Sequence, residues 1–204
     1  GGSSDDEFVA ALDKLEEKDL EGLIIDFRNN PGGYLPVAEK IADLFVRGEL
    51  PIVTQKGLGG ENSPERSSYP TDKARTGYPI VCLVNEYSAS ASEVVSGCLQ
   101  DYDRAIIVGQ RTYGKGSVQR LVGVDSEKGA MLKITVQYWY LPLGRCINTI
   151  RDEKGLVKKE GGVEPDISVE QKPLPLWQLE ERRKLRDNEA LLQYTEKNLD
   201  ALRP

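Results

Sequence analysis

Two residues in the middle of the chain, Ser90 and Lys115, are of types that can perform covalent acyl-transfer chemistry. Ser90 follows an apolar run at residues 80–84 and precedes an amphipathic segment, so we expect it at the junction of a strand and a helix. A helix start presents unpaired N–H groups that can stabilise an oxyanion, and that of Ala91 is the nearest to Ser90. Gly33, which follows another predicted strand, can supply a second N–H because it has no side chain to block approach.

Lys115 lies between Gly114 and Gly116, which permit turns that would direct its side chain inward. A lysine acts as a general base only if it is neutral near pH 7, which requires burial or a positively charged neighbour. The sequence contains no histidine, so mechanisms that need an imidazole base from this chain are excluded, including Ser-His-Asp and Cys-His catalysis. A hydrolase built from this chain must therefore use a lysine or a carboxylate as its base.

Each of these residues also has an ordinary interpretation. Residues 90–93 have the S-x-x-E form of a capping box, so Ser90 could simply cap the following helix, and Lys115 could be a solvated turn residue. A phosphate-binding loop is a third interpretation, because residues 109–115 fit G-x-x-x-x-G-K after an apolar run. Against it, Gly116 stands where Ser or Thr is needed, and a strand rather than a helix is predicted to follow.

Composition limits the classes of partner. The chain has 204 residues, 39% hydrophobic and 29% charged, which fits one globular domain or one domain with an appendage. A net charge of −6 argues against nucleic acid as the main partner. No apolar stretch approaches the roughly 20 residues of a membrane span, and no signal peptide opens the chain, although its start at GGSS suggests a fragment. The three cysteines lack C-x-x-C spacing, so no disulfide framework or zinc site is predicted.

Alternating strand and helix patterns predict an α/β fold. Helices are expected from about residue 5 to residue 18 and just after residue 35, and strands at residues 23–27, 51–53, 80–84, 105–108, 118–124 and 131–140. Residues 125–129 are predicted to be a polar turn, and residues 57–78 and 151–162 to be loops. Prolines 173 and 175 mark a boundary, after which helix formers predict one or two packing helices.

Four segments in order resemble the carboxyl-terminal processing proteases, tail-specific serine peptidases with a Ser-Lys dyad. They are D-x-R-N-N-P-G-G at residues 26–33, N-x-x-S-A-S-A-S-E at 85–93, L-Q-D-Y at 99–102 and G-x-x-T-x-G-K-G-S-V-Q at 109–119. Residues 162–167, GVEPDI, match the family's ending as well. The resemblance implies that Ser90 is the nucleophile, Lys115 the general base and Gln119 the residue that helps orient the lysine. It also implies that Ala91 and Gly33 form the oxyanion hole.

The same resemblance implies that Asp101, in L-Q-D-Y, supports the site without being a triad member, and that no metal or cofactor is needed. It implies a ClpP/crotonase-like core of stacked β-β-α units. We expect this core, N-terminally incomplete, at residues 1–171, and a C-terminal helical extension at residues 172–204. Family members usually carry a signal peptide and a PDZ domain before the core, and neither is visible here. A location outside the cytoplasm, in the bacterial periplasm or cell envelope, is implied.

The leading hypothesis from the sequence is a serine endopeptidase that cleaves protein substrates near their C-termini through an acyl-enzyme. Protein or peptide tails are the expected partners, and a homo-oligomer could form through the C-terminal helices. The alternative is a catalytically silent peptide-binding or scaffold relative with the same fold.

Overall fold

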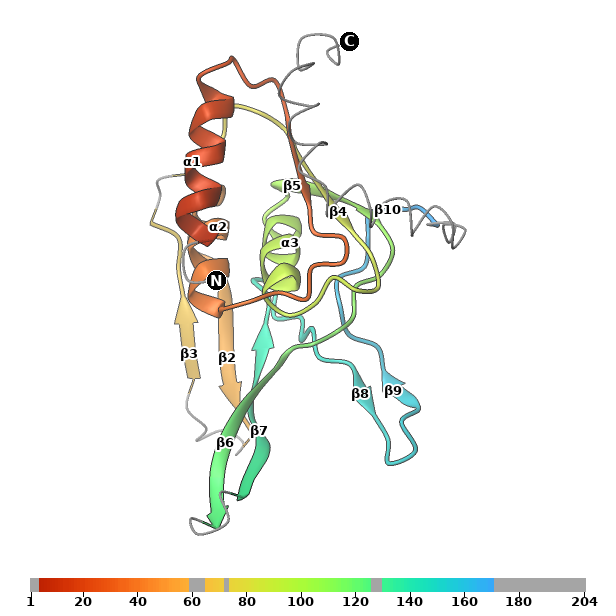
Figure 1. The fold of residues 1–204 in the computed structure, drawn as a ribbon. Coiled ribbons are helices and arrows are strands. Elements are labelled where there is room, and N and C mark those ends of the chain that lie inside the picture. Colours follow the sequence, from red (N-terminus) through yellow and green to blue (C-terminus); the bar gives the residue numbers. More distant parts are fainter. Residues whose placement is uncertain (1–3, 59–64, 72–73, 126–129, 171–204) are drawn as a thin grey trace, which may run out of the picture. The chain divides into compact units, whose positions relative to one another are not determined.

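The computed structural model describes residues 4–58, 65–71, 74–125 and 130–170 (Figure 1). The helical extension predicted at residues 172–204 lies outside them, as does most of the turn predicted at residues 125–129. The extension, an assembly through it and the domain boundary at residue 171 therefore stay predictions.

A four-stranded parallel sheet carries the loops that form the site. Its strands are, in spatial order, β1 (Leu23–Asp26), β4 (Ile80–Val84), β5 (Ala105–Gly109) and β10 (Ile167–Ser168). The first three are apolar runs, which is typical of strands in a parallel sheet. Because parallel strands point the same way, the loops that follow β1, β4 and β5 all leave the sheet at one edge.

The described residues form three helices: α1 (Ser4–Glu16), α2 (Leu35–Asp43) and α3 (Ala91–Asp101). Pro36 lies in the first turn of α2, where its missing N–H removes no helical hydrogen bond. Most of α3 is buried, and Cys98 on this helix lies in the core with Cys82 of β4. Burial raises the pKa of the Cys82 thiol to about 12, which fits the expectation of a plain core residue. No helix within the described ranges is long and apolar enough to cross a membrane.

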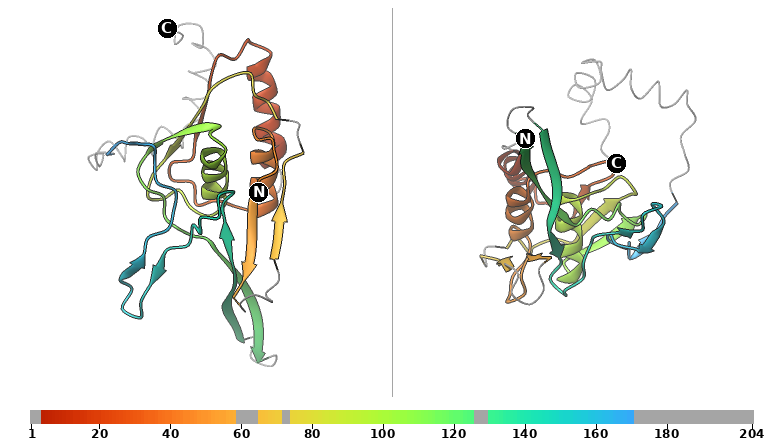
Figure 2. Two further views of the ribbon diagram at one scale, coloured as in Figure 1. Left: turned by 180° about the vertical axis from the view of Figure 1, so that it is seen from behind. Right: turned by 90° about the horizontal axis from the view of Figure 1, so that it is seen from below.

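Four further strands form an antiparallel sheet with the order β3 (Glu65–Ser68), β2 (Val53–Gly57), β7 (Ala130–Tyr140) and β6 (Ser117–Asp125). The paired strands β6 and β7 extend away from the helices as a long hairpin (Figure 2). A separate hairpin joins β8 (Ile150–Arg151) and β9 (Val157–Lys159).

Two loop predictions were wrong in part. β3 lies within residues 57–78, and β8 and β9 form a hairpin at residues 150–159. β3 is an edge strand that pairs only with β2, and its sequence, ERSS, is polar. It therefore lacks the apolar alternation by which a strand is predicted from sequence. The residues of β8 and β9 are exposed, so the same signal is missing there.

Candidate active site

Hydrogen bonds join the three loops that leave the parallel sheet at its common edge. The loop after β1 contains Asn30, whose carbonyl oxygen accepts a bond from the Ala89 N–H at 3.0 Å. The loop after β4 contains Ser88, whose carbonyl oxygen accepts a bond from the Tyr113 N–H, in the loop after β5, at 3.0 Å. The fold therefore brings the glycine, serine and lysine segments singled out in the sequence to one place.

Ser90 is buried, with 5% of its surface exposed, and stands directly before α3. Its backbone has φ 59° and ψ −118°, a left-handed conformation that is uncommon for a residue with a side chain. Such strain persists only where the surroundings hold it, and it concentrates at functional sites. A strained turn between a strand and a helix is also how α/β-hydrolases present a nucleophilic serine.

The carboxyl group of Glu93, which is fully buried, accepts four hydrogen bonds. Its Oε2 accepts from the N–H groups of Ser90 (2.7 Å) and Lys115 (2.8 Å). Its Oε1 accepts from the Thr112 hydroxyl (2.5 Å) and the Gly114 N–H (2.7 Å). Burial raises the pKa of Glu93, while these four hydrogen bonds act in the opposite direction. One buried group thus fixes the backbones of the candidate nucleophile and candidate base relative to each other.

This role of Glu93 was not predicted. The S-x-x-E pattern indicates the bond that its carboxyl group accepts from the Ser90 N–H, because a capping box is a local feature. The bond to Lys115 joins residues 22 positions apart, and no local pattern signals it.

The loop that carries Lys115 is held from its other side by two later segments. The Thr112 hydroxyl oxygen accepts from the Val163 N–H (2.7 Å), and the Gly114 carbonyl accepts from the Thr149 N–H (2.9 Å). Gly114 has φ +84°, and a Cβ there would lie 1.9 Å from the Thr149 hydroxyl oxygen. The glycine before Lys115 is therefore required by both its conformation and its packing.

The side chains of Lys115 and Gln119 are exposed. The described part of the chain thus brings together the backbones of Ser90 and Lys115, while Lys115 as a whole is an exposed residue. Gln119 lies on β6, which begins at Ser117. Because a strand and not a helix follows Lys115, the phosphate-binding-loop interpretation is wrong.

The glycine loop lies directly against the start of α3. A Cβ on Gly32, whose φ is +87°, would lie 2.5 Å from the Ala89 carbonyl oxygen and 2.6 Å from the Ala91 nitrogen. A Cβ added to Gly33, in contrast, would have no neighbouring atom within 4 Å. The loop therefore approaches α3 closely at Gly32, while the space next to Gly33 is open, as an N–H that binds an oxyanion would need. Gly33 and Ala91 both border the same open space, and their part in an oxyanion hole stays a prediction.

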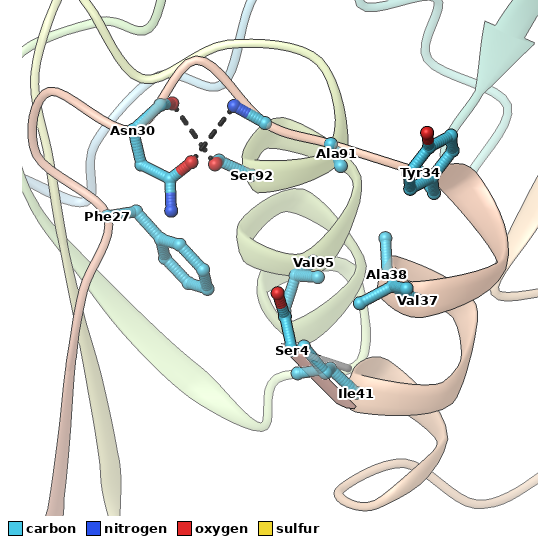
Figure 3. A pocket seen from close by; sticks show the side chains of 12 residues that line it. Ser4, Phe27, Asn30, Tyr34, Val37, Ala38, Ile41, Ala91, Ser92 and Val95 are labelled. Carbon is cyan, nitrogen blue, oxygen red and sulfur yellow. Dashed lines mark hydrogen bonds between the residues drawn. The ribbon is translucent and has the colours of Figure 1, made fainter. Parts of the chain in front are cut away.

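That open space is a pocket of about 240 Å³ (Figure 3). At one end Asn30 fixes the loop, because its Oδ1 accepts from the Gly32 N–H (2.9 Å) and its carbonyl oxygen accepts from the Ser92 hydroxyl (3.2 Å). The walls are mainly apolar and come from the loop after β1, α2 and α3: Phe27, Val37, Ala38, Ile41, Ala91 and Val95. The pocket therefore suits an apolar side chain. In the described residues, no group of three Cys, Asp or Glu side chains could hold a metal ion.

Asp101 lies at the opposite end of α3 from Ser90, about 15 Å along the helix at 1.5 Å per residue. Its side chain is 2% exposed, pairs with Arg145 and accepts a bond from the Leu143 N–H at 2.9 Å. Asp101 thus holds the turn after β7 and does not reach the serine. Its supporting role stays a prediction, and the structure limits that role to an indirect one.

Comparison with known proteins places these features in a wider setting. The model of peptidase family S41 matches residues 1–169. A carboxy-terminal-processing protease of Bartonella bacilliformis is 40% identical over 163 residues, which are 79% of this chain and 34% of the relative. The carboxy-terminal processing protease CtpB of Bacillus subtilis is 34% identical over 166 residues, 81% of this chain and 31% of the relative. The chain thus spans about a third of the length of these relatives.

Solved structures show the same likeness. The photosystem II D1 C-terminal processing protease matches with a TM-score of 0.65 at 31% identity, over 86% of this chain and 41% of that one. A lipoprotein from Streptococcus agalactiae matches with a TM-score of 0.54 at 20% identity, over 91% of this chain and 62% of that one, which shows a shared fold alone. The mixed α/β class predicted from the sequence is confirmed, and the ClpP/crotonase-like arrangement stays a prediction.

Proposed function

The chain belongs to peptidase family S41, and from this premise we propose that it is the catalytic core of a carboxyl-terminal processing serine protease. Ser90 attacks the scissile carbonyl, and Lys115 takes the hydroxyl proton and later gives it to the leaving amine. Water then hydrolyses the acyl-enzyme, which releases the acyl product and regenerates Ser90. The observation that carries the proposal is the shared Glu93 oxygen, which binds the N–H groups of both Ser90 and Lys115.

The surroundings of Ser90 support acyl transfer. The N–H groups of Ala91 and Gly33 would bind the oxyanion of the tetrahedral intermediate, since both residues line the same pocket and Ala91 directly follows Ser90. The apolar part of this pocket would take the side chain of the substrate residue that precedes the scissile bond. A volume of about 240 Å³ has room for an apolar side chain at that position.

The exposure of Lys115 sets a condition on this mechanism. A lysine is neutral near pH 7 only when desolvated or placed near positive charge. A peptide bound across Ser90 would exclude water from the lysine loop and so favour the neutral amine. Gln119, four residues further on, would then orient it.

The test is acylation by the p-nitrophenyl ester of an acetylated tripeptide, whose peptide part can exclude water from the site, followed by intact-mass spectrometry over a range of pH. We expect one acyl group on Ser90, with a rate that rises through an apparent pKa well below the usual lysine value of about 10.4. Ser90→Ala and Lys115→Ala should both abolish labelling while the circular dichroism spectrum is retained. Lys154→Ala, which changes an exposed lysine of the β8–β9 hairpin, is the matched control.

Full acylation in either site variant would contradict the dyad. A folded wild-type chain that is never acylated would instead favour the alternative, a silent peptide-binding relative, which the exposure of Lys115 and Gln119 motivates.

We also propose that the substrates are proteins with accessible C-terminal tails and that the protein acts in the bacterial periplasm or envelope. The names of the relatives support the first of these, and the family resemblance supports the second. Expression of a fusion to a reporter that is active only outside the cytoplasm would test the location in a bacterial host.

A further inference from the structure

Three exposed tyrosines stand in the three loops that build the candidate site. Tyr34 directly follows the glycine loop, Tyr87 lies three residues before Ser90, and Tyr113 lies two residues before Lys115. Their side chains are 68%, 60% and 58% exposed. All three loops leave the same edge of the parallel sheet, so the three tyrosines stand at that edge.

The fold itself gives little reason for these rings. Neighbouring loop positions are fixed by glycine conformations and by buried hydrogen bonds, whereas the tyrosine rings face solvent. Tyrosine offers a large, rigid contact surface with few rotatable bonds, and it is enriched among residues that dominate binding energies. Exposed rings on the rim of a site therefore suit the recognition of a polypeptide chain.

The surroundings of the three tyrosines place them in two groups. The Tyr113 N–H donates to the carbonyl oxygen of Ser88, so Tyr113 lies next to the segment that contains Tyr87. Tyr34 lines the apolar pocket, beside α2 and the start of α3 (Figure 3). Tyr87 and Tyr113 thus belong to the serine and lysine loops, and Tyr34 belongs to the pocket.

We propose that Tyr34, Tyr87 and Tyr113, here called the tyrosine rim, bind an extended peptide on both sides of the scissile bond. This rests on the function proposed above. Lys115 must reach the leaving amine to protonate it, so the rings next to the lysine loop contact residues after the scissile bond. Tyr34 contacts the acyl half, whose side chain enters the pocket. At about 3.3 Å per residue, rings beside Ser90 reach the first two or three residues of an extended chain, where apolar side chains fit them.

Two substrates with the same acyl half distinguish contacts before the scissile bond from contacts after it. The first is a p-nitrophenyl ester of an acetylated tripeptide ending in alanine, which has no residue after the scissile bond. The second is a peptide in which the same tripeptide is followed by five residues that begin with Leu-Phe. The full chain is measured as wild type and with Tyr34→Ala, Tyr87→Ala and Tyr113→Ala, by kcat and KM for each substrate, with unfolding in urea to check stability.

We expect Tyr87→Ala and Tyr113→Ala each to lower kcat/KM for the longer peptide about tenfold, mainly through KM, without changing the rate with the ester. Tyr34→Ala should lower kcat/KM for both substrates. The phenylalanine variants should retain most of the wild-type values because the ring carries the contact. Tyr69→Ala removes an equally exposed tyrosine outside these loops and should change nothing.

The proposed role of the tyrosine rim is wrong if Tyr87→Ala and Tyr113→Ala lower kcat/KM equally for both substrates. It is also wrong if they do not lower kcat/KM for the longer peptide. Either result leaves the peptidase proposal intact. Failure of an ester-reactive wild-type chain to cleave the longer peptide would overturn it too. A wild-type chain that reacts with neither substrate would instead overturn the proposed function on which the rim depends.

Discussion

Replacing Glu93 by glutamine removes one of the two acceptor oxygens that hold the candidate site together. Two of the four donors that now point at the carboxyl group must then face an NH2 group. The arrangement of least cost turns the NH2 toward Thr112, whose hydroxyl oxygen can accept from it. The Gly114 N–H and the Thr112 hydroxyl hydrogen then lose their acceptor. Because a buried unsatisfied donor costs about 1–3 kcal/mol, we expect Glu93→Gln to lose about 2 kcal/mol or more.

The same arrangement keeps the remaining oxygen on the N–H groups of Ser90 and Lys115, so acylation should fall by less than about tenfold. Glu93→Ala removes all four acceptors, and we expect it to lose about 4 kcal/mol or more. A displacement of about 1 Å between the two loops would lower the acylation rate about 100-fold. The variants should therefore separate into a mild and a severe class.

The assay combines the free energy of unfolding in urea with the rate of Ser90 acylation by the activated ester. Glu86→Gln and Glu86→Ala serve as controls, since Glu86 is an exposed glutamate in the loop that leads to Ser90. Wild-type acylation in a folded Glu93→Ala variant would refute the reasoning, because the four hydrogen bonds would then have no part in aligning the site. So would a Glu93→Gln variant as defective as Glu93→Ala.

Burial raises the pKa of Glu93 in the folded state above its ordinary value of 4.5, which applies to the unfolded state. Between the ordinary and the raised pKa, the folded state therefore binds the proton more tightly than the unfolded state does. The free energy of unfolding of the wild type, relative to Glu93→Gln, should therefore decrease as pH rises from about 4.5 through the raised pKa, and a constant difference in urea titrations would contradict this. Gly32→Ala should cost about 1–3 kcal/mol and abolish acylation, because its φ of +87° and the backbone 2.5 Å from the new Cβ oppose a side chain. Gly33→Ala should leave the urea midpoint unchanged, and equal midpoints for the two variants would disprove the assignment. Asp101→Asn weakens the pair with Arg145, which is partly exposed, so we expect a loss of only about 1 kcal/mol with an unchanged acylation rate per folded molecule. Lost acylation at full stability would instead mean that Asp101 acts on the site.

The positions of the site loops could be predicted from the sequence because strong local signals coincide there. The runs that became β1, β4 and β5 are apolar and short, and each ends at a motif rich in glycine, asparagine or serine. Parallel strands then force these motifs to one edge. The strand after Lys115, which excluded a phosphate-binding loop, was likewise visible as a run of strand-forming residues and is confirmed as β6.

The parts that could not be predicted depend on partners distant in the sequence or on exposure. The polar strand β3 is a strand only because β2 pairs with it. The glycines on either side of Lys115 indicate the backbone turn, but they carry no information about the surroundings of its side chain, which is exposed. The close approach of the glycine loop to α3 at Gly32 could not be predicted either, because two adjacent glycines give the same signal and only the packing distinguishes them.

The cap and nucleophile interpretations of Ser90 are not alternatives in this structure. The Glu93 carboxyl group binds the Ser90 N–H, as in a capping box, and the same oxygen binds the N–H of Lys115. An ordinary N-cap residue has an extended backbone, however, whereas Ser90 has φ 59°. A serine that only caps a helix has no need of that strained conformation, and it has no need of a buried carboxyl group that also fixes a lysine loop. The departure from ordinary cap geometry is therefore what distinguishes Ser90 as a candidate nucleophile, and it is visible only in the folded chain.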